Sequence, residues 1–335
     1  MSNKKKHNAF AVRCHFVGEK EIALYKYAES YFGKENTFFV INSEDKNLQV
    51  PQGYNHVLFN KDTILNYKEL FWARDIGWKC GDYCYYALNS VLSSYEYIWM
   101  AEPDLKICSE KAEDFFKAFE KHDHDFLATF LGRANKRLFF YPTARVLEAE
   151  PMSCLFPITR IKSEKIKILY DIRKKVSAKF IKGELPAKDY PNDEIFVATV
   201  SKRMGMKCAA LDRLTSFNFM LFRADKDTVF LDSDVEQVKG RFLLHPVLDK
   251  DVFMKKRLSI FRGVLRQSAE LGNWTHQTLS KIEDQDLKKT LQEKFLDEFK
   301  IFLGLKKPEE NRDDIGDTLQ GSAPQGSTKD DFDKI

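Results

Sequence analysis

SYEYIWMAEPDLKI, residues Ser94 to Ile107, is a run of aromatic and apolar residues that stops abruptly at Glu102-Pro103-Asp104. The apolar part predicts a buried strand over 95–101. In open α/β sheets, ligands bind beyond the carboxyl ends of the strands. Pro103 favours extended geometry in the residue before it, and residues i and i+2 of an extended segment point the same way. We therefore expect the carboxylates of Glu102 and Asp104 to converge on one point.

Two carboxylates at a strand end are typical ligands of Mg²⁺ or Mn²⁺, which proteins hold through one or two carboxylates plus substrate phosphates. Such an ion neutralises charge as a nucleotide diphosphate leaves. Glu-Pro-Asp is also ordinary turn chemistry, and as an isolated tripeptide it would favour a turn. Its position after a buried strand favours a metal-diphosphate site instead.

Strand and helix patterns alternate along the first part of the chain. This alternation predicts an α/β fold with a largely parallel sheet and helices on both faces. The later part adds helical patterns, with two short strands. The predicted strands are 9–17, 36–43, 54–60, 95–101, 125–132, 206–212 and 240–247, and the predicted helices are 21–32, 81–94, 110–122, 163–181 and 191–205.

Composition sets the domain organisation and the broad class. The chain has 335 residues, 43% of them hydrophobic, and a net charge of only +4, which argues against a nucleic-acid binder. We expect a catalytic domain over 1–248, an amphipathic helical C-terminal region over 249–305 and a disordered, Gly-, Ser- and Asp-rich tail over 306–335. The six cysteines form no CxxC pair, and no secretory signal or membrane span is evident, so we expect a cytoplasmic protein with free thiols.

The stretch GDYCYYALNSVLSSYEYIWMAEPDLKI resembles the core of GT-A-fold glycosyltransferases, in which a strand of the nucleotide-sugar domain ends in an Asp-x-Asp-type motif. YIWMAEPDLKI is similar to the Glu-Pro-containing motif of fungal α-mannosyltransferases. The layout matches over 9–132. The resemblance implies a Rossmann-like GT-A fold and metal-dependent transfer of a sugar from a nucleotide-diphosphate donor to a glycan or lipid-linked acceptor, as in bacterial capsule or lipopolysaccharide synthesis.

The resemblance also implies roles for the residues of the metal site. Asp104 matches the carboxylate that ligates Mn²⁺ or Mg²⁺ directly, and Glu102 matches the acidic position that faces the ribose or a metal-bound water. GT-A enzymes often add a late histidine, for which His245 in LLHPV is the candidate. The alternative for His245 is a histidine at a strand end with no ligand role.

The nucleotide is expected near the end of the first strand, where VRCHFVGEKE offers Arg13, His15 and Gly18. The guanidinium fork of arginine suits a diphosphate. The alternative is that these side chains face solvent. Asp82 lies where related enzymes approach the nucleotide, although a simple helix N-cap is an alternative.

An inverting enzyme needs a carboxylate that takes the proton of the acceptor hydroxyl. YPNDEIFVATV places Asp193 and Glu194 at a helix start, with Asp193 favoured. Both could instead only stabilise the helix N-terminus electrostatically. The fungal enzymes retain anomeric configuration, and their acceptor-side pattern is only faintly suggested at 152–166, so the stereochemistry stays open.

Three further features bear on partners and on rival functions. The basic stretches 163–181 and 249–267 suit peripheral contact with the inner face of an anionic membrane, or simply solvated faces. KHDHDF at 121–126 is interpreted as a polar connection. The rival functions are a non-catalytic binding module and a sugar nucleotidyltransferase, although FVGEKE lacks the Gly-rich phosphate loop expected of the latter.

Overall fold

The computed structural model describes residues 6–43, 48–66, 69–72, 76–223, 229–236, 238–259, 285–286, 289–290 and 293. The chain divides into two units, Met1–Phe261 and Arg262–Ile335. In the predicted C-terminal helical region, residues 250–259 and the described positions beyond 284 are helical. The rest of that region and the predicted tail at 306–335 lie outside the described residues.

A seven-stranded sheet forms the centre of the first unit, in the order β3-β2-β1-β4-β7-β6-β8. All neighbouring pairs are parallel except those of β7, which runs antiparallel to β4 and β6. The predicted α/β class with a mostly parallel sheet is confirmed. The strands are β1 (Lys6–Cys14), β2 (Thr37–Asn42), β3 (His56–Phe59), β4 (Tyr95–Ala101), β6 (Phe126–Arg133), β7 (Met152–Lys162) and β8 (Cys208–Ala210).

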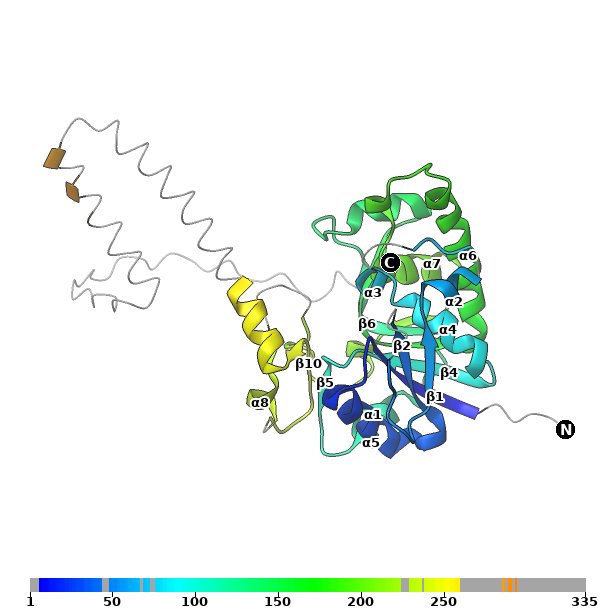
Figure 1. Cartoon of the computed structure of the whole chain (residues 1–335), viewed down its shortest axis with the longest axis horizontal. Helices are drawn as coiled ribbons and strands as arrows, with labels where there is room; N and C mark the ends of the chain where they lie inside the picture. Colours follow the sequence, from blue (N-terminus) through cyan, green and yellow to red (C-terminus); the bar gives the residue numbers. More distant parts are fainter. Residues whose placement is uncertain are drawn as a thin grey trace, which may run out of the picture. The chain divides into compact units, whose positions relative to one another are not determined.

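Helices cover both faces of the sheet (Figure 1). Alternate residues of β1 face opposite ways: Phe10 and Val12 join one apolar cluster, and Ala9 and Ala11 join the other. The Phe10 cluster contains residues of α1 (Glu19–Phe32) and α5 (Ala112–Phe116); the Ala9 cluster contains residues of α4 (Asp82–Leu92), α6 (Ser163–Ile181) and α7 (Asp193–Arg203). The short helices are α2 (Lys61–Asn66), α3 (Ile76–Lys79) and α8 (Asp232–Val235), and 3₁₀ turns occupy Lys34–Asn36, Lys117–Phe119, Tyr141–Leu147, Ala187–Asp189 and Leu211–Arg213.

The strand β7 was not expected from the sequence, which linked 152–166 only to the acceptor side of the site. Pro157 lies in the middle of β7 and lacks the N–H that a central strand donates to its neighbour. The pairing with β6 shifts register beside it, at Ala128 and Thr129. On the other side, the Pro157 carbonyl accepts the backbone N–H of Glu102 at 2.9 Å. The proline is therefore accommodated where the ladder is irregular, next to the end of β4.

A second, small sheet attaches a late part of the chain to the end of β4. The strands β5 (Lys106–Cys108) and β10 (Phe242–Leu244) pair antiparallel, with Leu244 opposite Lys106. A third sheet pairs β9 (Phe230–Leu231) with β11 (Val247–Leu248). These short pairings bring residues 242–248 to the loop that follows β4.

Candidate metal and carboxylate site

The stretch after β4 is a tight turn. β4 ends at Ala101, and the backbone N–H of Leu105 donates to the carbonyl of Glu102 at 3.2 Å, with Pro103 and Asp104 between them. Proline is favoured at the second position of such turns because its φ is fixed there. The expectation that Glu102 and Asp104 align along an extended segment is therefore wrong. The turn itself brings the two carboxylates together.

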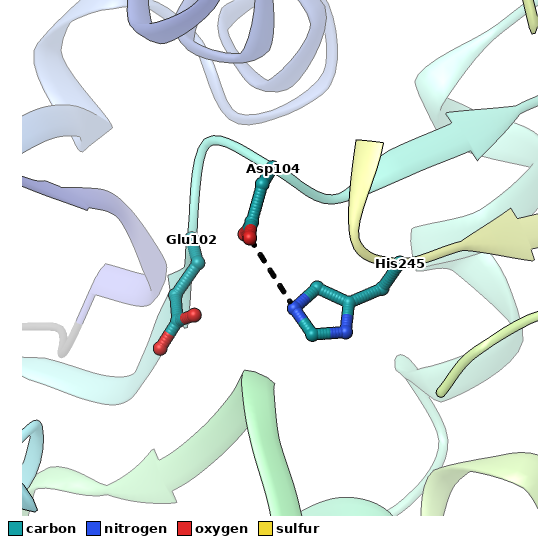
Figure 2. A group of neighbouring side chains, drawn as sticks. All are labelled: Glu102, Asp104 and His245. Carbon is teal, nitrogen blue, oxygen red and sulfur yellow. Dashed lines mark ion pairs between the residues drawn. The ribbon is translucent and has the colours of Figure 1, made fainter. Parts of the chain in front are cut away.

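His245 completes a group of three side chains whose ligand atoms could hold a metal ion (Figure 2). It follows β10, and the backbone N–H of Val247 donates to the carbonyl of Asp104 at 2.7 Å, which holds this segment against the turn. One ligand atom from each of Glu102, Asp104 and His245 lies within 4.8 Å of the others. We call this group the Glu102 triad. The structure thus places His245 beside the two carboxylates, as the sequence predicted, although the resemblance and not the spacing suggested it.

The hydrogen bonds of His245 orient its ring toward Asp104. Its Nδ1 lies 2.5 Å from the carbonyl oxygen of Arg223, which can only accept, so Nδ1 carries the proton and donates. Nε2 faces Asp104 Oδ2 at 3.5 Å (Figure 2). A histidine that donates one ring N–H to a backbone carbonyl and directs the other nitrogen inward has the arrangement common among metal ligands.

The donor set of the triad fits a divalent cation. Among the described residues, Asp104 Oδ1 is buried without a hydrogen-bond partner. A bound cation would satisfy this oxygen. Two carboxylates and one imidazole suit Mn²⁺, and the carboxylates alone suit Mg²⁺.

Burial disfavours the charged forms of Asp104 and His245, but their hydrogen bond and mutual attraction outweigh it. The pKa of Asp104 is therefore lowered and that of His245 is raised. Lys20 adds a positive charge that also lowers the pKa of Asp104. The Nζ of Lys20 donates to the carbonyl of Val247 at 2.8 Å. Lys20 was not among the site residues predicted from the sequence. Lys20 lies within VRCHFVGEKE, the segment already considered for the nucleotide, and this position could have drawn attention to it.

Arg13 lies beside the triad but is engaged by the protein itself. The parallel register pairs Val12 with Ala101, so the next residues, Arg13 and Glu102, are neighbours. Arg13 Nη1 lies 2.8 Å from Glu102 Oε1 and 3.4 Å from Asp193 Oδ2, and Nη2 donates to the carbonyl of Gly77. The guanidinium is buried in these contacts, whereas the sequence prediction had it bind a diphosphate.

The two candidate bases at the start of α7 differ in accessibility. Asn192 caps the helix by accepting the N–H of Ile195 at 3.2 Å. Asp193 is buried: its Oδ2 accepts the N–H of Gly81 at 2.8 Å, and burial raises its pKa well above the usual value against the opposing charge of Arg13. This environment makes Asp193 a structural carboxyl rather than an accessible base.

Glu194 is partly exposed and is the better candidate base. Burial raises its pKa to about 7; a hydrogen bond from Asn192 Nδ2 at 3.1 Å opposes this shift, and the charge of Glu102 adds to it. A carboxyl with a pKa near neutrality can both accept and release a proton at physiological pH. The order of preference given by the sequence, Asp193 before Glu194, is reversed by this geometry.

Asp82 has neither of the two roles considered from the sequence. It is the first residue of α4, whose N-cap is Gly81. It is fully buried, and its two oxygens accept Arg173 Nε and Nη2 at 2.7 Å each, with Tyr86 donating at 2.6 Å. A carboxylate enclosed in this way is not open to a nucleotide.

The remaining nucleotide candidates lie just beyond β1. His15 is exposed, with Nδ1 2.9 Å from the carbonyl oxygen of Asn42. Gly18 is the N-cap of α1, and its N–H donates to Glu21 Oε2 at 2.9 Å. Both residues follow a strand whose end adjoins the triad, so their predicted contact with a nucleotide stays a prediction.

Within the described part of the chain, the histidine-aspartate motif at 121–126 forms no comparable group. Asp123 pairs with Lys207, and Asp125 accepts the backbone N–H of Lys207 at 2.9 Å. The carbonyls of His122 and His124 accept Arg160. The Lys207 contacts join the segment before β6 to the segment before β8, and the Arg160 contacts join it to β7.

On the basic helix α6, Lys174 and Lys167 pair with Glu69 and Asp171 at 2.6 Å each. In the part of the chain that the structure describes, we find no helix with the length and apolar character needed to cross a membrane.

Comparison with known proteins gives no family assignment. No protein-family model matches this chain, and a search of curated proteins found no match.

Proposed function

We propose that this chain is a metal-dependent glycosyltransferase of the GT-A type. It would transfer a sugar from a nucleotide-diphosphate donor to a glycan or lipid-linked acceptor. The observation that carries the proposal is the convergence of Glu102, Asp104 and His245 at the carboxyl end of β4, beside Glu194 with its raised pKa. This is the edge of an α/β sheet where ligands bind.

The residues divide into three tasks. Glu102, Asp104 and His245 would hold Mn²⁺ or Mg²⁺, which supplies Lewis-acid stabilisation of the leaving diphosphate. Glu194 accepts the proton of the acceptor hydroxyl, because its pKa of about 7 leaves a substantial carboxylate fraction at neutral pH. Asp193 ties the start of α7 to Gly81 and so fixes the place of Glu194.

The biological setting is proposed from the resemblance and from the charge pattern. A cytoplasmic enzyme of bacterial capsule or lipopolysaccharide synthesis would meet a lipid-linked acceptor at the inner membrane face. The basic stretches 163–181 and 249–267 could support peripheral contact there. Because lysines of α6 are paired with acidic residues, such contact is expected to be weak and sensitive to salt.

A thermal-shift panel tests the proposal. UDP, GDP, CMP and their common sugar conjugates are added with Mn²⁺ or with EDTA to the wild type, to Asp104→Asn and to the matched control Asp123→Asn. One nucleotide should raise the melting temperature of the wild type and of the control only with Mn²⁺, since a ligand of the native state stabilises it by mass action. Asp104→Asn should lose this shift.

Two other outcomes would direct the assignment elsewhere. No shift with any nucleotide, in a protein that unfolds cooperatively, contradicts the transferase proposal and leaves the binding module. If UTP or GTP, added as further ligands, gives a shift and a sugar nucleotide forms from a sugar phosphate, the protein is a nucleotidyltransferase. A positive panel is followed by transfer assays with the selected donor, in which Glu194→Gln should be inactive.

A further inference from the structure

We propose that Arg13 is a positioning residue of the metal site, which holds Glu102 in its ligand-binding orientation and ties it to α3 and to the start of α7. This inference rests on the metal site of the proposed function. In this proposal Arg13 binds carboxylates of the protein itself, and not a phosphate of the substrate.

The contacts of Arg13 fix one oxygen of Glu102. Glu102 is the first residue after β4, and its side chain is 26% exposed, so packing alone does not determine its rotamer. Arg13 Nη1 holds Oε1 at 2.8 Å, a charge-assisted hydrogen bond. A carboxylate that is held through one oxygen presents the other in a defined direction. The role resembles that of the hydrogen-bonded partners that orient metal ligands in general.

The surroundings of Arg13 are shaped to receive a guanidinium. A Cβ at Gly81 would lie 1.9 Å from Arg13 Nη1 and 2.4 Å from Asp193 Oδ2, so only glycine leaves room for this pair. The carbonyl of Gly77 accepts Nη2. Arg13 therefore fills a space between α3, α4 and α7 that other side chains at position 81 would close.

The charges around Arg13 explain why its removal should weaken metal binding. Glu102 and Asp193 both contact the same nitrogen of Arg13, and Glu194 adds negative charge near both carboxylates. Without the guanidinium, these carboxylates repel one another across a poorly solvated space. Glu102 would lose its 2.8 Å contact and rotate away from Asp193, and in that orientation it ligates a cation poorly.

The test measures binding of Mn²⁺ alone, by calorimetry and by the electron paramagnetic resonance signal of free Mn²⁺. The variants are Arg13→Lys, which keeps the charge without the fork, and Arg13→Met, which keeps only the apolar stem. The matched control is Arg173→Lys, at a buried arginine whose partners are Asp82 and the Pro191 carbonyl. Arg13→Met should raise the Mn²⁺ Kd by about 10- to 100-fold, the range seen for outer-shell partners of metal ligands.

Arg13→Lys should raise the Kd less, because the charge remains. Arg173→Lys should lower the melting temperature without changing the Kd for Mn²⁺. Wild-type affinity in a folded Arg13→Met protein overturns the inference; so does an equal loss in Arg173→Lys, or a wild type that does not bind Mn²⁺. If Arg13→Met does not fold, an unchanged Kd in Arg13→Lys overturns it. A wild type that binds Mn²⁺ but no nucleotide refutes the transferase and leaves the role of Arg13 standing.

Discussion

Two arginines, Arg173 and Arg13, are buried in the same unit, and they differ in how exposed their carboxylate partners are. Arg173 binds both oxygens of Asp82 and the Pro191 carbonyl, and its guanidinium lies 3.9 Å from the ring centroid of Phe196. Neither side chain of the Arg173–Asp82 pair is more than 1% exposed. This pair is enclosed on all sides.

Arg13 instead shares one nitrogen between Glu102 and Asp193, and the Glu102 side chain is 26% exposed. Glu102 remains partly exposed at the carboxyl end of β4, whereas Asp82 is enclosed in the protein interior. This difference suggests how to recognise a buried ion pair that belongs to a functional site. One of its two side chains should remain partly exposed to solvent. Burial of the arginine alone does not distinguish the two cases.

The largest expected effect comes from breaking the enclosed pair. Arg173→Met leaves Asp82 buried without a counter-charge, which should lower the free energy of unfolding by about 3–5 kcal/mol. Urea unfolding followed by circular dichroism measures the loss. Adding Asp82→Asn should recover part of it, because the uncompensated charge is then gone. If the double variant is no more stable than Arg173→Met, stranded charge is not the cause.

A smaller effect is expected where the backbone approaches Arg13. Gly81→Ala puts a methyl group 1.9 Å from Arg13 Nη1, and relief of this overlap should cost about 1–3 kcal/mol. It should also weaken Mn²⁺ binding, because the guanidinium must move. Gly132→Ala is the control, since its Cβ would have no neighbouring atom within 4 Å. Equal melting temperatures for the two variants would contradict the tight contact at Gly81.

A third expected effect concerns the pH dependence of stability in the metal-free protein. Burial raises the pKa of Glu194 from 4.5 to about 7, so the folded state binds a proton more readily than the unfolded state. Its stabilising contribution is complete below pH 4.5 and is lost as the pH rises through about 7. Glu194→Gln removes this dependence, so its melting temperature relative to wild type should rise between pH 5 and pH 8. An unchanged difference across that range would show that the pKa is not raised.

The overall fold could be predicted because its signals are local. The apolar run before Glu102 and the periodic spacing in α1 identify a strand and a helix without knowledge of their neighbours. β7 escaped prediction because Pro157 argues against a central strand, and only its pairing with an irregular part of β6 makes the proline acceptable.

The sequence predicted which residues lie at the candidate site better than it predicted the role of each residue. Glu102, Asp104 and His245 are brought together, but the carboxylates meet through a turn rather than an extended segment. The partner of Asp82 is Arg173, far along the chain, and nothing in the local pattern around Asp82 indicates a buried pair. Roles that depend on contacts between distant segments require the structure.

The pairing of β5 with β10 has a consequence for folding kinetics. Three residues on each side bring His245 to Asp104, so the triad depends on closing a very long loop through a short ladder. Contacts of high sequence separation form slowly, because the chain entropy of loop closure must be lost before they stabilise anything. We expect the sheet around β1 and β4 to form first and the triad to assemble late. Metal binding, measured as a function of time during refolding, would then report on the last step of folding and not on collapse of the core.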